Sequence, residues 1–171
     1  MDFYVSDVYG AMEKNCPRVV YTAGTFDILH KGHIRLLEQC RQIAGRDGLV
    51  CVGLNSDAFV TKYRNRPPIM TQDERFAVLA AMRNVNAVIF NDDPQWDYMK
   101  QAFLIGLKID NLGLPPSPAR FLVIGSDWAA KDYYKQIDVT QAQLDRHRIA
   151  LCYVPYTEGI SSTDIRWRVR Q

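Results

Sequence analysis

Residues 18–33 have the sequence RVVYTAGTFDILHKGH. The first six residues are rich in β-branched and aromatic side chains, which is typical of a β-strand. A helical pattern follows at 31–44, where apolar side chains recur every three or four residues. Its apolar face consists of Ile34, Leu37, Cys40 and Ala44. A strand, a glycine-containing turn and a helix in this order predict the first unit of an α/β sheet.

The same alternation continues to the end of the chain. Further strands are predicted at 48–54, 87–90, 121–125 and 149–154. Helices are predicted at about 71–83, with Phe76, Leu79, Ala80 and Met82 as core candidates, near 97–106, and from about 162. Loops are predicted at 62–68 and 112–120. This order predicts an α/β fold, a Rossmann-like doubly wound parallel sheet of about five strands with helices on both faces. Ligands bind such sheets at the carboxyl ends of the strands, where the strand order reverses.

Length and composition limit the class of protein. The chain has 171 residues, of which 47% are hydrophobic and 23% charged, and we expect residues 17–171 to form a single domain after an N-terminal extension at 1–16. A net charge of +2 is too small to favour nucleic-acid binding. No apolar stretch approaches the roughly 20 residues that cross a bilayer, and the N-terminus lacks a signal-peptide pattern. Cys40, Cys51 and Cys152 are expected to be core thiols, which suits a cytoplasmic protein.

Two histidines, His30 and His33, flank Lys31 and Gly32 where the first helix begins. A helix N-terminus offers unpaired N–H groups and partial positive charge, and both suit phosphate. Imidazoles three residues apart lie on one helical face and can donate hydrogen bonds to an oxyanion. Zinc binding would need further ligands, and the third histidine, His147, lies in a charged helical stretch. A purely structural role for the pair is the other alternative.

The last helix is preceded by the sequence YTEGISSTDI, residues 156–165. Ser161 with Asp164 resembles a capping box, which is a structural interpretation of the hydroxyl groups. A hydroxyl-rich helix start is also suited to phosphate, and the two interpretations are compatible.

Together the two motifs resemble the cytidylyltransferase-like nucleotidylyltransferases with their HxGH signature. The string GTFDILHKGHIRLLE, residues 24–38, is closest to glycerol-3-phosphate cytidylyltransferases, and 156–165 resembles their RTEGISTT motif. The resemblance implies that His30 and His33 are catalytic and stabilise the α-phosphate. It also implies nucleotide contacts by Thr25, Phe26, Gly32, Thr157, Gly159, Ile160, Ser161, Ser162 and Thr163. Tyr156 departs from the motif, because the family has arginine there.

Further residues take their roles from the same resemblance. Lys62 matches a catalytic lysine on a basic loop that reaches the phosphates, although a solvated loop is the plain alternative. GSDW at 125–128 resembles the family's GDDW segment, which implies that Asp127 and Trp128 hold the base or ribose. The acceptor or phosphate ligands are then Asp27, Asp57, Arg75 and Arg83, the two arginines being predicted on one face of one helix.

The resemblance implies transfer of CMP from CTP to a small phosphorylated alcohol, most simply glycerol 3-phosphate, with release of pyrophosphate. Mg²⁺ is expected to bind with the triphosphate rather than to the protein alone. A heptose-1-phosphate adenylyltransferase that uses ATP is an alternative, because Lys62 and Arg66-Pro67 also resemble that group. A catalytically silent relative is another.

Two expectations concern partners. The family is commonly dimeric, so a homodimer is expected, with Trp96 and Trp167 as interface candidates. The arginines at 166–170 could stack on RNA bases, but cations near a helix C-terminus more simply offset the helix dipole. Neither nucleic acid nor a membrane is an expected partner.

Overall fold

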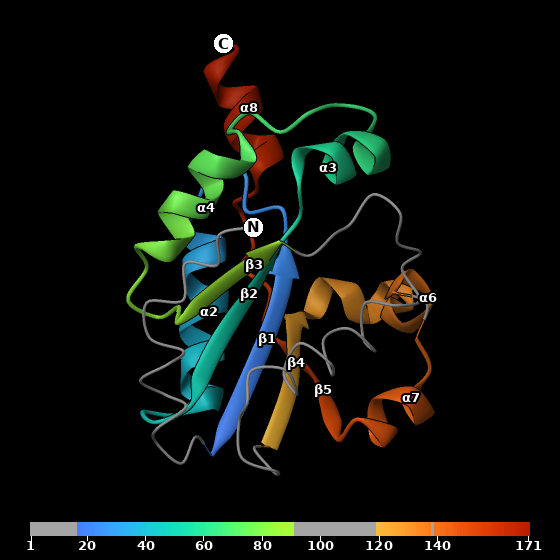
Figure 1. Ribbon diagram of the computed structural model, residues 1–171. Coiled ribbons are helices and arrows are strands. Elements are labelled where there is room, and N and C mark those ends of the chain that lie inside the picture. Colours follow the sequence, from blue (N-terminus) through green and yellow to red (C-terminus); the bar gives the residue numbers. More distant parts are fainter. Residues whose placement is uncertain (1–16, 91–118, 138) are drawn as a thin grey trace.

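The computed structural model describes residues 17–90, 119–137 and 139–171 (Figure 1). Five parallel strands form one sheet in the order β3-β2-β1-β4-β5. The strands are β1 (Arg18–Gly24), β2 (Leu49–Leu54), β3 (Ala87–Phe90), β4 (Ala119–Gly125) and β5 (Ile149–Val154). The strand order reverses between β1 and β4, which places the expected ligand crevice beyond the carboxyl ends of these two strands. The predicted α/β fold class is confirmed.

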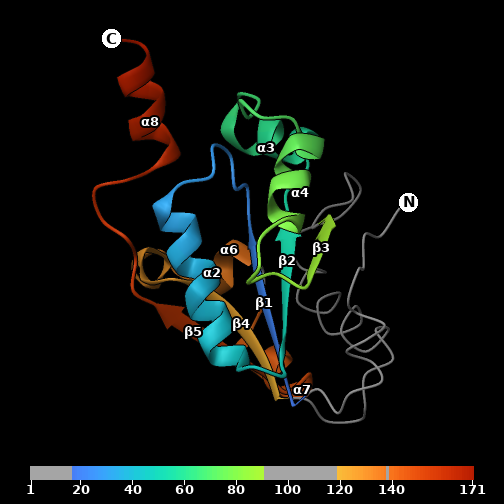
Figure 2. The same ribbon diagram turned by 90° about the vertical axis from the view of Figure 1, so that its left-hand side faces the viewer.

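The helices pack on both faces of the sheet (Figure 2). On one face, α2 packs Cys40 and Ala44 against Val20, Val50 and Val123. On the other face, α6 and α7 contribute Tyr133 and Leu144 to a cluster that contains alternate strand residues. The helices are α2 (Lys31–Ala44), α3 (Asp57–Arg64), α4 (Gln72–Ala80), the 3-10 helix η1 (Ser126–Lys131), α6 (Tyr133–Ile137), α7 (Gln141–Arg146) and α8 (Ser162–Val169). Both faces of the central strands are therefore buried, as a continuous apolar run such as 49–54 requires.

Several expected elements differ in their bounds. The basic stretch that begins at Lys62 is helical as far as Arg64, because α3 starts from the Ser56 cap and runs on. Ala119 and Arg120 belong to β4 rather than to a loop, and they pair with Arg18 and Val19 of β1.

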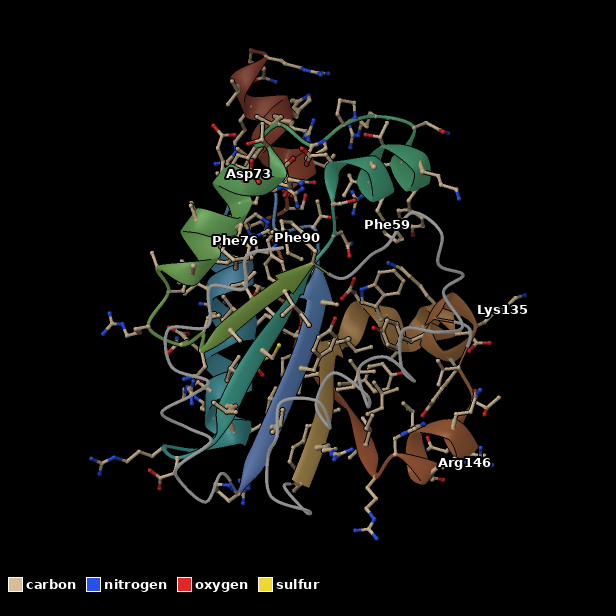
Figure 3. All side chains as sticks on the ribbon, viewed as in Figure 1. Phe59, Asp73, Phe76, Phe90, Lys135 and Arg146 are labelled. Atoms are coloured by element: carbon tan, nitrogen blue, oxygen red, sulfur yellow. The ribbon has the colours of Figure 1, made fainter. Side chains whose placement is uncertain are left out.

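The helix predicted at 71–83 is shorter than expected. A capping box formed by Thr71 and Glu74 begins α4, which ends at Ala80. Ala80 is exposed and is not a core residue, whereas Leu79 is fully buried. Phe76 of α4 stacks on Phe90 at the end of β3 with 5.7 Å between ring centroids (Figure 3).

Some predictions lie outside the described residues, namely the extension at 1–16, the helix near 97–106, Trp96 and the loop as far as residue 118. Cys40 and Cys51 are buried as expected, while Cys152 is only partly buried. Across the three described ranges, no helix is long and apolar enough to span a bilayer.

Candidate active site

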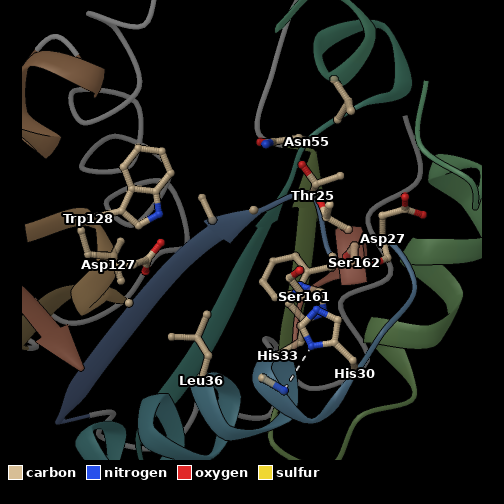
Figure 4. A pocket seen from close by; sticks show the side chains of 18 of the residues that line it. Thr25, Asp27, His30, His33, Leu36, Asn55, Asp127, Trp128, Ser161 and Ser162 are labelled. Atoms are coloured by element: carbon tan, nitrogen blue, oxygen red, sulfur yellow. Dashed lines mark hydrogen bonds between the residues drawn. The ribbon is translucent and has the colours of Figure 1, made fainter. Parts of the chain in front are cut away.

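A pocket of about 690 Å³ opens beyond the carboxyl ends of β1 and β4, where the strand order reverses. The turn after β1 and the start of α2 form one part of its wall, and α8 begins beside them (Figure 4). Asp127 and Trp128 lie across the end of β1 from the two histidines (Figure 4). The predicted residues that line the pocket are Thr25, Phe26, Asp27, His30, Gly32, His33, Asp127, Trp128, Thr157, Ile160, Ser161, Ser162 and Thr163.

The turn after β1 is held in an unusual backbone conformation. Phe26 and Ile28 have φ angles of 51° and 50°, a region that side chains with a Cβ seldom adopt and that costs about 1–3 kcal/mol each. The carboxylate of Asp27 stabilises the turn by accepting from the backbone N–H groups of Ile69 and Met70 at 3.0–3.1 Å. It also pairs with the guanidinium of Arg166. A strained backbone that several surrounding contacts hold in place is typical of functional sites.

Asp27 is buried, and burial by itself raises the pKa of a carboxyl group. The N–H groups of Met70 and Ile69 and the Arg166 guanidinium outweigh this effect, so the pKa of Asp27 lies below its ordinary value. The carboxylate of Asp27 is therefore charged, and protein N–H groups already bind it. It stabilises the turn and is not free to bind a metal ion.

The two histidines stack on each other at the start of α2. Their ring centroids are 3.9 Å apart with an interplanar angle of 20°. His30 is the N-cap of α2, and its Nδ1 accepts from the backbone N–H of Gly32 at 3.2 Å. Gly32 permits this close approach, since a Cβ there would lie 3.0 Å from the His30 ring. With Nδ1 as acceptor, the proton of neutral His30 is assigned to Nε2.

Burial keeps both imidazoles neutral. It lowers the pKa of His33 to about 3, an effect that neighbouring His30 strengthens and that Asp27 partly offsets. It also lowers the pKa of His30, against the opposing charge of Asp164. Nδ1 of His33 is buried and has no hydrogen-bond partner in the described part of the chain. The pair can therefore donate hydrogen bonds to an anion without carrying a full charge of its own.

The hydroxyl groups at the start of α8 have separate roles. Ser161 is the N-cap, and its Oγ accepts from the N–H of Asp164 at 3.1 Å, as the capping interpretation predicted. Ser162 donates from Oγ to the backbone oxygen of Asp27 at 2.6 Å, which fixes α8 beside the β1 turn. Thr163 lines the pocket with an exposed side chain. Gly159 lies outside the pocket lining, and its φ of 70° instead allows the turn that leads into α8.

Aromatic and charged side chains gather on the far side of the pocket. Trp128 packs edge-on against Tyr133 at 5.7 Å, and Nζ of Lys131 lies 4.9 Å from the centroid of the Trp128 ring. Lys131 also approaches Asp127 at 3.6 Å. Tyr156, which replaces the family arginine, lines this side as well. Such a surface suits a flat, polar-edged group such as a nucleobase.

Arg75 and Asp57 bind each other instead of facing the pocket. Arg75 is only 1% exposed, and its Nη2 lies 2.6 Å from Oδ1 of Asp57. Its remaining donors bind backbone oxygens: Nη1 those of Thr25 (2.6 Å) and Asn55 (2.9 Å), and Nε that of Met70 (3.1 Å). Neither member of the pair lines the pocket, and their binding of an acceptor or a phosphate stays a prediction. Their role is to hold the β1 turn and its neighbours in place.

Lys62 and Arg83 also lie outside the pocket lining. Lys62 is on α3 with an exposed side chain, and Arg83 is exposed in a turn beyond the end of α4. The predicted helix face shared by Arg75 and Arg83 therefore does not exist. Besides Tyr156, the cations and aromatic residues that line the pocket without having been assigned to it as site residues are Phe59, Tyr63, Arg64, Arg66, Lys131, Tyr133 and Arg166. Arg66 had been noted for its resemblance to heptose-1-phosphate adenylyltransferases, and Arg166 follows Ser162 by four residues, which places both on one face of a helix.

The described residues contain no group of three or more His, Cys, Asp or Glu side chains that could hold a metal ion.

Comparisons with known proteins include relatives of three kinds. Glycerol-3-phosphate cytidylyltransferase of Bacillus subtilis is 33% identical over 86% of this chain and 93% of its own length. Bifunctional protein HldE of Campylobacter concisus is 31% identical over 92% of this chain, which spans only 28% of that protein. An FAD synthase of Korarchaeum cryptofilum is 38% identical over 45% of this chain and 53% of its own length.

Solved structures share the fold at lower identity. A lipopolysaccharide core biosynthesis protein from Thermoplasma volcanium superimposes with a TM-score of 0.54 at 17% identity, over 82% of this chain and 98% of that one. A protein with unknown function from Archaeoglobus fulgidus gives a TM-score of 0.52 at 16% identity, over 83% and 93% of the two chains.

The cytidylyltransferase-like family model matches residues 21–168, which include the motifs at 24–33 and 156–165 and every strand of the sheet apart from the first residues of β1. With that match and a Bacillus relative aligned over nearly its whole length, the chain belongs to the cytidylyltransferase-like family of nucleotidylyltransferases.

Proposed function

We propose that this protein transfers CMP from CTP to a small phosphorylated alcohol, with glycerol 3-phosphate as the favoured acceptor, and releases pyrophosphate. The observation that carries the proposal is the neutral, stacked pair His30 and His33 at the start of α2, which lies beside the hydroxyl-rich start of α8 in one pocket (Figure 4). The choice of substrate is supported by the similarity to the Bacillus glycerol-3-phosphate cytidylyltransferase.

In the proposed reaction an oxygen of the acceptor's phosphate attacks the α-phosphorus of the nucleotide. The bond from the α-phosphorus to the bridging oxygen breaks, and pyrophosphate leaves. No side chain has to act as nucleophile, so the protein contributes positioning and charge stabilisation. Nε2–H of His30 and an imidazole N–H of His33 are proposed to donate to α-phosphate oxygens as charge develops there.

The rest of the pocket holds the nucleotide. The N-terminus of α8, with Ser161, Ser162 and Thr163, is proposed to bind the β- and γ-phosphates. Trp128 and Asp127 are proposed to hold the base and ribose. Mg²⁺ is proposed to enter with the triphosphate, whose oxygens supply its ligands and whose charge it partly neutralises.

The direct test is pyrophosphate release in the presence of Mg²⁺, with CTP and ATP each combined with glycerol 3-phosphate and heptose 1-phosphate. Release with CTP and glycerol 3-phosphate supports the proposal. Release with ATP but not with CTP would contradict the proposal and indicate an adenylyltransferase. CTP binding without release from any pair would point to an untested acceptor or to a catalytically silent relative.

A matched pair of variants tests the role assigned to the histidines. His33→Asn is expected to lower kcat by about 10²–10³-fold, the usual cost of losing one donor to a developing oxyanion. His147→Asn is the control, because this third histidine follows α7 and does not line the pocket. A folded His33→Asn enzyme with near-native turnover would contradict the mechanism.

A second candidate is an adenylyltransferase that joins AMP from ATP to heptose 1-phosphate. One observation favours it: Arg66 and Pro67, which resemble that group, line the pocket. Only this candidate expects ATP to be preferred, so the same assay separates the two.

The homodimer stays a prediction. Trp167 of α8 is 61% exposed and is available to an interface.

A further inference from the structure

Three aromatic side chains line the pocket beyond the carboxyl ends of β4 and β5, namely Trp128, Tyr133 and Tyr156. They differ in how much of each ring a ligand could reach. Tyr133 is only 8% exposed and belongs to the core cluster on this face of the sheet. Trp128 packs against the same cluster, and Nζ of Lys131 lies 4.9 Å from the centroid of its ring. Protein groups therefore already engage both of these rings.

Tyr156 is held at its backbone and is open toward the pocket. It is 47% exposed and follows β5 by two residues. Its backbone N–H donates to Oγ of Ser126 at 3.1 Å, which fixes it to the end of β4. A Cβ at Gly125 would lie 3.7 Å from Cδ2 of Tyr156 and 2.6 Å from Oδ1 of Asp127. The ring of Tyr156 and the carboxylate of Asp127 therefore both adjoin this glycine.

The two sides of the pocket suit different chemical groups. Because the sheet order is β3-β2-β1-β4-β5, α3, which follows β2, lies on the other side of β1 from Tyr156. Arg64 and Arg66 line the pocket from α3 and the following loop, which suits the phosphate of an acceptor. An open aromatic ring beside the carboxylate of Asp127 suits a flat base that carries an amino group, as cytosine and adenine do. A small phosphorylated alcohol has no such ring.

We infer that the base of the nucleotide stacks on the ring of Tyr156, with Asp127 beside it to accept from the amino group of the base. The inference rests on the proposed function, because it requires a nucleotide in this pocket. It gives a binding role to the residue at which the chain departs from the cytidylyltransferase motif, and it leaves Trp128 to border the base rather than to stack on it. Stacking does not depend on the hydrogen-bonding pattern of a base, so Tyr156 strengthens the binding of cytosine and adenine nucleotides alike.

The test is titration calorimetry with Mg²⁺ and either CTP or ATP, whichever the wild-type protein binds more tightly, and separately with inorganic tripolyphosphate, which has no base. Tyr156→Ala is expected to weaken nucleotide binding by about 10- to 100-fold, the usual value of stacking between a base and an aromatic side chain. Binding of tripolyphosphate should stay within about 2-fold of wild type. Tyr156→Phe keeps the ring and should bind the nucleotide within about 2-fold of wild type. Tyr153→Ala is the matched control, because Tyr153 is 40% exposed on β5 but does not line the pocket.

NMR gives a second readout of stacking. The ring resonances of Tyr156, assigned by their loss in Tyr156→Phe, should shift when the nucleotide is added and stay in place when tripolyphosphate is added. Equal losses of both affinities in Tyr156→Ala, or nucleotide binding that matches wild type, would overturn the role of Tyr156 and leave the proposed function to the pyrophosphate-release assay. A wild-type protein that binds neither CTP nor ATP would overturn the nucleotide site itself, and this inference with it. Thermal unfolding of each variant confirms that it is folded before it is titrated.

Discussion

At the scale of single residues, burial decides what the two histidines can do. His33 is expected to stay neutral throughout the physiological range, because burial lowers its pKa to about 3. In the unfolded chain its pKa is about 6.5, so between pH 6.5 and 3 unfolding takes up a proton. The free energy of unfolding should therefore fall as the pH is lowered through this window, by up to about 1.4 kcal/mol per pH unit from this residue.

NMR titration of the imidazole resonances measures this directly. The His33 signals should not titrate above about pH 4. In His33→Asn, the pH dependence of stability between pH 6.5 and 3 should become shallower. A His33 midpoint near 6.5 in the folded protein would contradict the neutral imidazole on which the proposed mechanism depends.

A second prediction at this scale concerns the buried arginine of α4. Arg75→Lys should lower the free energy of unfolding by about 1.5–3 kcal/mol, because lysine cannot reproduce the fork that binds Asp57 together with three backbone oxygens. Arg83→Lys is the control and should change stability by less than about 0.5 kcal/mol, since Arg83 is exposed in a turn. Urea unfolding of both variants measures the difference. Equal effects would mean that the Arg75 network contributes little.

Residue types in the motifs were enough to find the pocket but not to assign every role. His30, His33 and Ser162 line it as the sequence suggested. Asp57 and Arg75 were expected to bind ligand, and their binding of each other was not predicted, because a sequence does not show which donors and acceptors satisfy one another inside the fold.

At the scale of elements, the helical nature of α3 changes which cation reaches the pocket. Lys62 was expected on a basic loop, but α3 extends to Arg64, and Arg64 lines the pocket whereas Lys62 does not. Positions that are two residues apart in a helix, such as Lys62 and Arg64, are rotated by about 200° about the helix axis. The two side chains therefore cannot face the same side. Arg64→Gln should therefore raise the KM for the nucleotide by about 10-fold, the effect of losing one charged hydrogen bond.

Lys62→Gln is the matched control and should leave the KM within about 2-fold of wild type. Steady-state kinetics of pyrophosphate release compares the two variants at constant ionic strength, because removal of any cation weakens long-range attraction to an anionic substrate. A larger effect in Lys62→Gln would show that this segment rearranges when substrate binds and would restore the original interpretation of Lys62.

Strands were easier to predict than helix ends. Strands β3 and β5 match their predicted ranges, because short apolar runs between polar segments have few alternatives in a parallel sheet. The end of α4 was misplaced by about one turn. Residues 81–83 contain no glycine or proline, so only tertiary packing marks that end.

At the scale of the whole molecule, the site was predictable because topology determines it. Reversal of the strand order between β1 and β4 brings together segments from both ends of the chain, and the pocket lies there. The long-range contacts that close it were not predictable. Asp27 binds Ile69 and Met70 before α4 and Arg166 on α8, a separation of 139 residues between Asp27 and Arg166. Nothing in the local sequence of any of these segments specifies its partners.

The Asp27 contacts predict that the C-terminal helix is held to the sheet chiefly by one carboxylate. Asp27→Asn keeps the shape of the side chain but leaves the buried Arg166 without its counter-ion, which typically costs about 3–5 kcal/mol. Hydrogen exchange should therefore show faster opening of the α8 amides and of the Ile69 and Met70 amides. The amides of α2, which pack on the sheet independently of Asp27, are the internal control and should lose protection only as far as global stability falls.

Acid should reproduce the effect in the wild-type protein. The folded pKa of Asp27 is lowered, so its contribution is fully present above the unfolded value of about 3.9 and is lost as the pH falls through the folded value. Protection of α8 should then decrease with acid in wild type and much less in Asp27→Asn. If α8 stays equally protected in both proteins at neutral pH, its attachment depends on the Ser162 bond and on packing rather than on this carboxylate.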